Sequence, residues 1–329
     1  MKKFLQDERG SNIIIVALSM VVILIFAAFA IDLGAAYVKT AEVQTAADAA
    51  VMAAGLQLPV SVSDTAKQSS MIATVLEYLG KNGIADTSEV NVYFAEEENN
   101  FYTRIGVDVP ASSPTGFARI IGMDEVTFTR SAEARAVPCT ALSDLVPLSA
   151  REDVLSALIA SGNTEHVILK YGKNTDDVVQ GAFGAIDLDG LNGGGANDYC
   201  SWLTNGYQGE LTVGTELPIE TGNMSGPTLT GLAERYNACT HFQSDGGCTA
   251  EHYVADCPRL MKVPVVQYID SHTVRIVGFA AFIIEDYTTY EDEGYVIGTY
   301  VNMVNIGAAS GDLTGTAENF GVYSLTLSK

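Results

Sequence analysis

The chain has 329 residues, of which 40 are acidic and 18 are Lys or Arg, and its formal net charge is −22. A surface this acidic repels nucleic acid and anionic lipid headgroups at long range, so we expect no nucleic-acid partner. Because 47% of the residues are hydrophobic, the composition also excludes a disordered stalk.

The first predicted element is a membrane span. Residues 13–31 carry no charge and only one polar side chain, Ser19. About 20 apolar residues in a helix cover the ~30 Å hydrocarbon thickness of a bilayer, so we expect residues 12–33 to lie in the lipid. Basic side chains cluster before the span, which predicts that residues 1–11 stay in the cytoplasm and that the rest is exported. A cleaved signal peptide has a shorter apolar core, which favours an uncleaved single-pass anchor.

The helical pattern continues beyond the span. Alanine dominates the next 25 or so residues, and no proline intervenes between Ile31 and Leu58. One helix of about 45 residues can therefore run from the membrane into the exported part. Small side chains on this helix form a thin face that another helix or a sheet can approach closely. The face is either gripped by other subunits or packed only against its own domain, and its helix-packing residues are Ala46, Ala47, Asp48, Ala49 and Ala50.

A small α+β domain is predicted over residues 34–138. Apolar residues at helical spacing indicate a second helix, with Asp64 as its N-cap. The apolar period then changes to two, which is typical of strands. The expected elements are a helix over 64–80, strands over 90–94 and 105–109 joined by an acidic turn, a short helix over 115–121 and a strand over 126–136.

Residues 139–329 are predicted to form a β-rich distal domain. Two continuous apolar runs within it indicate long strands that are covered on both faces, or packed on one face and in an interface on the other. The fold class is therefore α+β: a transmembrane helix extended into one long helix, then the small α+β unit and the β-rich distal domain. The expected elements are strands over 166–171, 211–213, 262–269, 273–284, 295–306 and 321–327, with helices over 152–160 and 228–236.

The chain has five cysteines, and thiols outside a membrane oxidise, so one or two disulfides are the first interpretation. The alternative is a zinc site in residues 239–257, where His241 and His252 accompany three of the cysteines. The spacing of these residues matches no standard zinc module. The disulfide candidates are Cys139, Cys200, Cys239, Cys248 and Cys257.

Oxygen ligands gather around three glycines between residues 181 and 200, and such ligands suit calcium. The spacing lacks the glycine and the closing glutamate of an EF-hand loop, so tight glycine turns are the competing interpretation. No other cofactor is expected. The calcium candidates are Asp187, Asp189, Asn192 and Asp198.

An envelope hydrolase built on Ser225 and a histidine is the weakest interpretation. Ser225 lies in a turn before an apparent helix, but Asn223 occupies the place of the glycine that a nucleophile elbow requires. The sequence also has no phosphate-binding loop, no dinucleotide fingerprint and no HExxH motif. We therefore expect no catalytic residues.

The N-terminal residues resemble the TadE/TadG-like Flp pilus-assembly family. The resemblance covers about fifty residues and is carried by Glu8-Arg9-Gly10, the apolar span, Ile31-Asp32, Gly34, Tyr37, Glu42-Val43-Gln44 and Ala46-Ala47-Asp48-Ala49-Ala50. Residues 117–122 and the alanine-alternating strand ending at Ala136 are also similar to the family's first domain.

This resemblance implies a membrane-anchored or minor-pilin-like part of the Tad (tight adherence) apparatus, which assembles Flp-type pili. It implies other Tad proteins or pilins as partners, and no enzyme activity. Pilin-like relatives are cleaved after a glycine, which makes Gly10 and Ser11 the candidate processing residues. The relatives carry glutamate at the fifth mature position, whereas Ile15 stands there in this chain and favours a static anchor. A stand-alone surface adhesin is the alternative.

Overall fold

The computed structural model describes residues 9–98, 100–162, 167–171, 184–191, 195–220, 224–284, 287, 295–305, 309–310 and 318–328. The chain divides into two compact units. The N-terminal unit comprises residues 1–55, 62–134 and 327–329. The C-terminal unit comprises residues 56–61 and 135–326.

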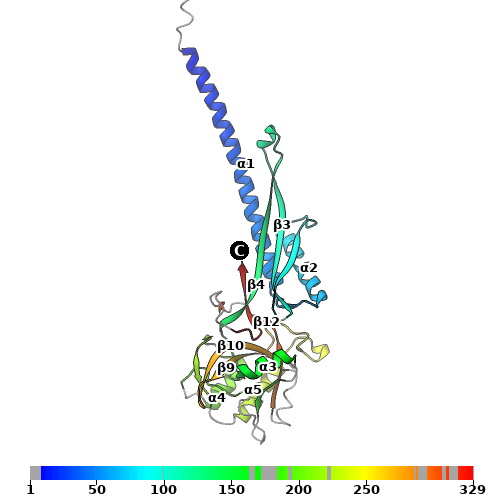
Figure 1. Cartoon of the computed structure of the whole chain (residues 1–329), viewed down its shortest axis with the longest axis vertical. Coiled ribbons are helices and arrows are strands. Elements are labelled where there is room, and N and C mark those ends of the chain that lie inside the picture. The colour runs from blue at the N-terminus through cyan, green and yellow to red at the C-terminus, as the bar shows by residue number, and fades with distance from the viewer. Residues whose placement is uncertain are drawn as a thin grey trace, which may run out of the picture. The chain divides into compact units, whose positions relative to one another are not determined.

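The N-terminal unit begins with one unbroken helix, α1 (Arg9–Gly55), of 47 residues (Figure 1). At 1.5 Å per residue it is about 70 Å long. Its first half is apolar and exposed along residues 13–31, apart from a half-buried Ala28, whereas Val43, Ala47 and Val51 in its second half are fully buried. The predicted continuous helix is thus confirmed, and one of its segments is long and apolar enough to cross a membrane.

The second half of α1 packs against helix α2 (Thr65–Lys81) and strand β3 (Phe101–Pro114). The N-cap of α2 is the predicted Asp64, whose carboxylate accepts a hydrogen bond of 2.9 Å from the Lys67 amide. Apolar side chains at helical spacing on α2 and at alternate positions on β3 close this core. These side chains are Met71, Val75 and Leu79 on α2 and Ile105, Val107 and Val109 on β3.

A long hairpin completes the N-terminal unit. Strand β2 (Asn91–Glu98) pairs antiparallel with β3, and β3 pairs with β4 (Glu125–Leu142), which continues into the C-terminal unit. The predicted short helix between β3 and β4 is a single 3₁₀ turn, η1 (Ala118–Ile121), which ends at Gly122 with a positive φ of 89°. The left-handed conformation of Gly122 explains why the helix stops there.

The C-terminal unit is built around an antiparallel pair, β9 (Leu260–Tyr268) and β10 (Thr273–Ile283), in a sheet of order β5-β9-β10-β11-β6 with β8 also paired to β10. Strand β14 (Val322–Ser328) lies between β4 and β12, and β7 and β13 pair with β4. The remaining elements are β1 (Val60–Ser61), β5 (Ala150–Arg151), α3 (Glu152–Ser161), β6 (Val167–Tyr171), α4 (Gly195–Asn205), β7 (Leu211–Thr212), β8 (Glu216–Pro218), α5 (Ser225–Ala238), η2 (Gln243–Asp245), β11 (Tyr295–Val301), β12 (Met303–Val304) and β13 (Ala309–Ser310).

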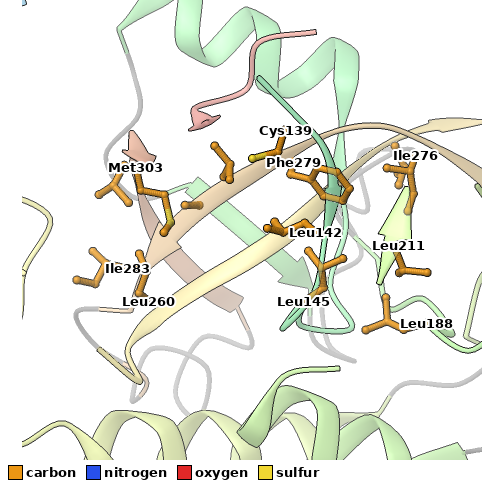
Figure 2. Packing of buried hydrophobic residues seen from close by; sticks show 14 of the residues in the cluster. Cys139, Leu142, Leu145, Leu188, Leu211, Leu260, Ile276, Phe279, Ile283 and Met303 are labelled. Carbon is orange, nitrogen blue, oxygen red and sulfur yellow. The ribbon is translucent and has the colours of Figure 1, made fainter. Parts of the chain in front are cut away.

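Strand β10 separates two hydrophobic clusters. Phe279, Ala281 and Ile283 belong to one cluster, part of which is drawn in Figure 2, and the alternate residues Ala280 and Phe282 belong to the other. Successive side chains of a strand point to opposite faces, so β10 is buried on both. This arrangement explains its uninterrupted apolar run, because a strand with one wet face alternates apolar and polar residues.

Helix α4 falls in the glycine-rich stretch that the sequence pattern favoured as turns. It packs on α5, where Gly231 is tight against it: a Cβ on Gly231 would lie 3.0 Å from the Leu203 side chain. Tyr199 is buried and its hydroxyl bonds Thr228 Oγ1 at 3.1 Å. These two aligned helices, rather than a coil, cover the second cluster of the C-terminal unit.

Candidate functional site

A buried carboxylate marks the end of the apolar half of α1. Asp32 is only 8% exposed, although the residues on both sides of it are exposed. Its two oxygens accept hydrogen bonds from the amides of Gly116 (2.8 Å), Phe117 (2.9 Å) and Ala118 (2.6 Å). These amides open η1 and would otherwise lack acceptors, as the first N–H groups of any helix do. Asp32 therefore caps η1 from a distant part of the chain. It fixes the tip of the β3–β4 hairpin, residues 115–124, to α1.

The tip that Asp32 holds is apolar and exposed. The large exposed side chains are Phe117, Ile120, Ile121 and Met123, of which Ile120 is 82% exposed. Three of them, with α1 residues between 21 and 31, line a groove of about 580 Å³. The apolar surface of the span and that of the tip are therefore continuous.

The alanine face of α1 lies largely inside its own unit. Ala46, Ala47 and Ala50 are 2%, 0% and 0% exposed, in the part of α1 that packs on α2 and β3. Asp48 and Ala49 are partly exposed. These three alanines pack within their own domain. Of the five predicted helix-packing residues, only Asp48 and Ala49 are accessible to another subunit.

Asp48 is also bound to its own unit. Gln44 Nε2 donates to Asp48 Oδ1 at 2.8 Å and to the carbonyl of Ser131 on β4 at 3.1 Å. Gln44 and Asp48 are four residues apart and so lie one above the other on the helix surface. The Gln–x–x–x–Asp pair therefore ties α1 to β4 through one amide.

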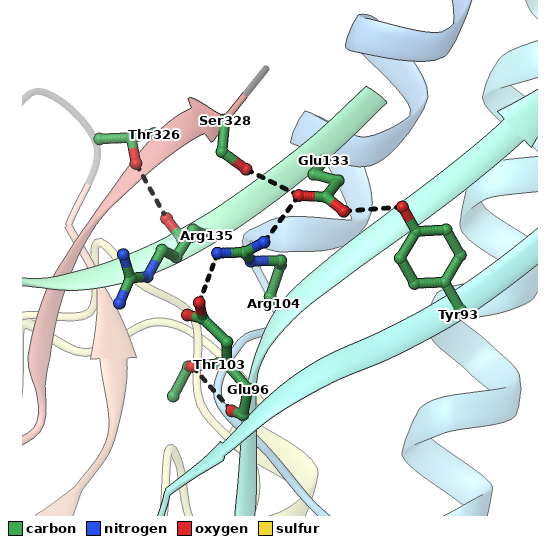
Figure 3. A network of polar contacts seen from close by, with 8 residues as sticks. All are labelled: Tyr93, Glu96, Thr103, Arg104, Glu133, Arg135, Thr326 and Ser328. Atoms are coloured by element: carbon green, nitrogen blue, oxygen red, sulfur yellow. Dashed lines mark hydrogen bonds and ion pairs between the residues drawn. The ribbon is translucent and has the colours of Figure 1, made fainter. Parts of the chain in front are cut away.

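A second polar network joins strands β2, β3, β4 and β14 (Figure 3). Glu133 accepts hydrogen bonds from Tyr93 Oη at 2.7 Å, Arg104 Nη1 at 2.9 Å and Ser328 Oγ at 3.1 Å. Arg104 also pairs with Glu96. The hydrogen bond from Tyr93 lowers the pKa of Glu133 despite its partial burial, and bonds from Ser328 and Arg104 act in the same direction. Burial, with the bond to Glu133, raises the pKa of Tyr93 to about 12.

We expect Glu133→Gln to destabilise the N-terminal unit by about 1–3 kcal/mol at neutral pH, because hydrogen bonds to a charged group are lost. The folded pKa of Glu133 lies below its unfolded value of about 4.3. Its contribution is therefore present above that value and is lost as the pH falls through the folded pKa. Urea unfolding at pH 7 and at pH 3 measures the loss. The exposed Glu77→Gln variant, which breaks only a surface pair with Lys81, is the matched control. An equal deficit for Glu133→Gln at both pH values would contradict the expectation.

The apolar span and its helical extension are the part of the chain that matches a known family. Residues 10–57 match the family model described as "Putative Flp pilus-assembly TadE/G-like". The matched segment contains the apolar half of α1, Asp32 and the buried alanines. No curated protein and no solved structure matches the chain.

The TadE/G-like match supports a role associated with Flp pilus assembly, structural rather than catalytic, and together with the apolar helix it supports a membrane location. The suggested processing residues, Gly10 and Ser11, lie in the first turns of α1, where the structure describes the helix but not their side chains.

No disulfide joins any of the five described cysteines in this structure. Four of the five candidates are buried, and Cys200 on α4 is partly exposed. Cys239, Cys248 and Cys257 come together with His241, and among the described residues these form the group of His, Cys and acidic side chains placed to hold a metal. The predicted disulfides remain a prediction, with Cys239 and Cys257 the pair whose sulfurs lie 3.6 Å apart.

The cysteine thiols of the chain differ in acidity. Burial alone would raise the pKa of Cys239, but hydrogen bonds from the backbone of Cys248 and His241 and from the neighbouring thiols lower it to about 6. Burial raises the pKa of Cys139, which stands apart from the group, to about 12.

The described calcium candidates do not form a common cage. Asp187 is buried and its carboxylate accepts from the Asp189 amide at 3.3 Å, while Asp189 accepts from the Leu191 amide at 2.9 Å. Asp198 is exposed in the first turn of α4. Asn192 lies outside the described residues, so a calcium site at this loop stays a prediction.

Ser225 is exposed at the first residue of α5. The three histidines that the structure describes contact other groups: His241 approaches Cys239, His252 stacks on Phe242 and His272 bonds Ser271. His166 lies outside the described residues. None of these three described histidines forms a hydrogen bond with Ser225.

Sequence reasoning missed the role of Asp32. Asp32 lies in the segment that the family model matches, but its partners lie 84 to 86 residues further along the chain. The available signal was chemical: an acidic residue at the end of an apolar span needs hydrogen-bond donors. Such donors were available in the predicted short helix over 115–121, whose first amides have no side-chain cap of their own.

Proposed function

We propose that this chain is a membrane-anchored, minor-pilin-like component that helps to assemble a Flp/Tad pilus or its secretion machinery. The observation that carries the proposal is the coincidence of the TadE/G-like match, residues 10–57, with a helix that is apolar in its first half and built into a folded domain in its second. Such a helix holds a folded unit at a fixed distance from the bilayer. Other Tad proteins or pilins are the expected partners.

Anchoring through residues 12–33, with the N-terminus in the cytoplasm, follows from the apolar span and its basic leading flank. We expect protease added to spheroplasts to degrade the two folded units and leave a membrane-embedded fragment. A cytoplasmic marker protein, which protease must not reach, is the control. Full protection of the folded units in closed spheroplasts would overturn the proposed orientation.

The function is tested by deleting the gene in its native bacterium and isolating the complex formed by the wild-type chain. We expect loss of surface pili on deletion, recovery with the wild-type chain, and co-isolation of pilus-assembly proteins from detergent extracts. A chain that lacks residues 12–33 should fractionate as a soluble protein and fail to restore pili. Normal piliation without the chain would contradict the proposal and favour a stand-alone adhesin.

A further inference from the structure

Three sulfurs and one imidazole nitrogen meet in the C-terminal unit, in the segment between α5 and β9. The ligand atoms of Cys239, His241, Cys248 and Cys257 all lie within 4.8 Å of one another. Zinc holds thiolate sulfur at about 2.3 Å, which separates two sulfurs of a tetrahedron by about 3.8 Å. Cys239 Sγ lies 3.6 Å from Cys257 Sγ and 4.0 Å from His241 Nδ1. The donors therefore have close to the spacing of a coordination tetrahedron.

We propose that Cys239, His241, Cys248 and Cys257 bind one structural Zn²⁺ ion. Three cysteines and one histidine are a donor set found in closed structural zinc sites, which leave no position for substrate. Binding requires three thiolates and a neutral imidazole, so the three thiol protons pass to solvent and no electron is transferred.

The surroundings suit such an ion. The three cysteines are 3%, 0% and 3% exposed, so the site is shielded from water. Arg259 donates to the carbonyls of Gly246 at 3.1 Å and Cys248 at 3.3 Å and so holds the loop that carries Cys248. Zinc with three thiolates carries one negative charge, and the Arg259 guanidinium is a nearby positive one.

The local backbone also favours a fixed loop. Gly247 has a φ of +100°, a conformation that favours glycine, and it lies close to the guanidinium, since a Cβ there would be 2.6 Å from Arg259 Cζ. His252 is not in the group, and its ring lies against Phe242 with centroids 3.7 Å apart and planes inclined by 35°. The structure therefore selects His241 over His252 as the nitrogen ligand.

The test measures metal and thiols in the full-length protein purified in detergent without chelator. We expect one zinc per chain by elemental analysis and an intact mass that shows no loss of hydrogen to a disulfide. Cys248→Ser should retain at least tenfold less zinc against a competing chelator, because one ligand is lost. The matched control, Cys200→Ser, changes a cysteine outside the group and should retain zinc as the wild type does.

Reconstitution with Co²⁺ separates loss of a ligand from loss of folding. The wild type and Cys200→Ser should show thiolate-to-cobalt charge-transfer bands and tetrahedral ligand-field bands, while Cys248→Ser should show weaker ones with unchanged circular dichroism. A metal-free protein that binds neither ion would overturn the proposal. A mass lower by two hydrogens, with Cys239 and Cys257 linked in one peptide, would overturn it in favour of a disulfide.

The apolar tip of the β3–β4 hairpin carries a second, independent inference, which rests on the proposed membrane anchoring. Phe117, Ile120 and Ile121 line one groove with the span residues of α1. Together with Met123 they are exposed apolar side chains placed at a surface that already faces lipid. We propose that this tip enters the hydrocarbon of the bilayer beside α1.

Hydrogen bonding makes the tip fit for lipid, where an unpaired backbone group costs several kcal/mol. Asp32 satisfies three amides at the start of η1. Within the tip, the amides of Thr115, Ile120 and Gly122 bond the carbonyls of Asp124, Phe117 and Arg119 at 3.0–3.1 Å. Arg119 is exposed and long enough for its charge to reach the headgroups while its stem stays in apolar surroundings.

The test places a single tryptophan at chosen sites of the full chain, in vesicles with lipids brominated on their acyl chains, after Trp202→Phe has removed the native fluorophore. We expect Ile120→Trp to be quenched by bromine and protected from aqueous iodide. Tyr78→Trp, on an exposed site of α2, should show the reverse. Phe26→Trp in the span should be quenched by bromine.

Each outcome has one meaning. If Phe26→Trp fails to be quenched by bromine, the membrane anchor itself is wrong. If Phe26→Trp is quenched but Ile120→Trp is accessible to iodide, the anchor stands and the tip proposal is overturned. Protection of Ile120→Trp from both quenchers would also overturn it, because another protein surface would then cover the tip.

Discussion

Ala50→Leu is expected to destabilise the N-terminal unit by about 1–3 kcal/mol, because a larger side chain at this buried site forces α1 away from α2 and β3. Ala50 is fully buried, at the point where the second half of α1 packs on both elements. The measurement is urea unfolding of the full chain in detergent, with hydrogen exchange of the α2 amides as the local probe. The C-terminal unit should keep its exchange protection.

The matched control is Ala41→Leu, which adds the same atoms to an exposed position of α1. It should change the free energy of unfolding by less than about 0.5 kcal/mol. The pair also separates the two interpretations of the alanine face. If Ala50→Leu leaves folding intact but prevents co-isolation with pilus proteins, the face serves another subunit rather than the domain core.

Phe282→Ala is expected to cost the C-terminal unit about 3–5 kcal/mol, the largest single loss that we anticipate. Phe282 is fully buried on β10 and meets the Tyr300 ring with centroids 5.9 Å apart. Gly298 is tight against it, since a Cβ on Gly298 would lie 2.9 Å from Phe282 Cβ. Removal of the ring leaves a cavity between β10 and β11 that these closely packed neighbours fill poorly.

Thermal unfolding monitored by hydrogen exchange tests this prediction, with Ile269→Ala as the control at a 44% exposed position after β9. Amides of β9 and β10 should lose protection in Phe282→Ala, while those of α2 should not. Equal loss of protection in both units would contradict the division of the chain into separately stabilised units.

Much of the fold is accessible from sequence because its signals are local. The continuous α1 follows from apolar and alanine content without proline, and α2 from helical spacing after an Asp64 cap. The apolar run of β10 predicts a strand that is covered on both faces, or packed on one face and in an interface on the other, and the structure has the first arrangement. Helix α4 is not predicted from the sequence, because glycines surround it and its amphipathic pattern is short.

The candidate sites resist prediction because they are non-local. The hydrogen-bond donors to Asp32 lie more than 80 residues further along the chain. They belong to a tip whose apolar residues follow neither a helical nor a strand period. Cys239, Cys248 and Cys257 follow one another at intervals of nine residues, a spacing typical of no zinc module. Only the fold of the segment between α5 and β9 selects His241 from the two neighbouring histidines.

Strand β14 has a consequence for how the protein matures. It lies beside β4, and Thr326 Oγ1 on β14 reaches the Arg135 carbonyl on β4 across 191 positions of sequence. A growing polypeptide cannot complete this pairing until the ribosome has passed Thr326. The edge of β4 that faces β14 therefore stays unpaired during most of translation. Unpaired edges invite wrong strand pairing. The late arrival of β14 therefore leaves β4 open to wrong strand pairing until the last residues of that strand have been made.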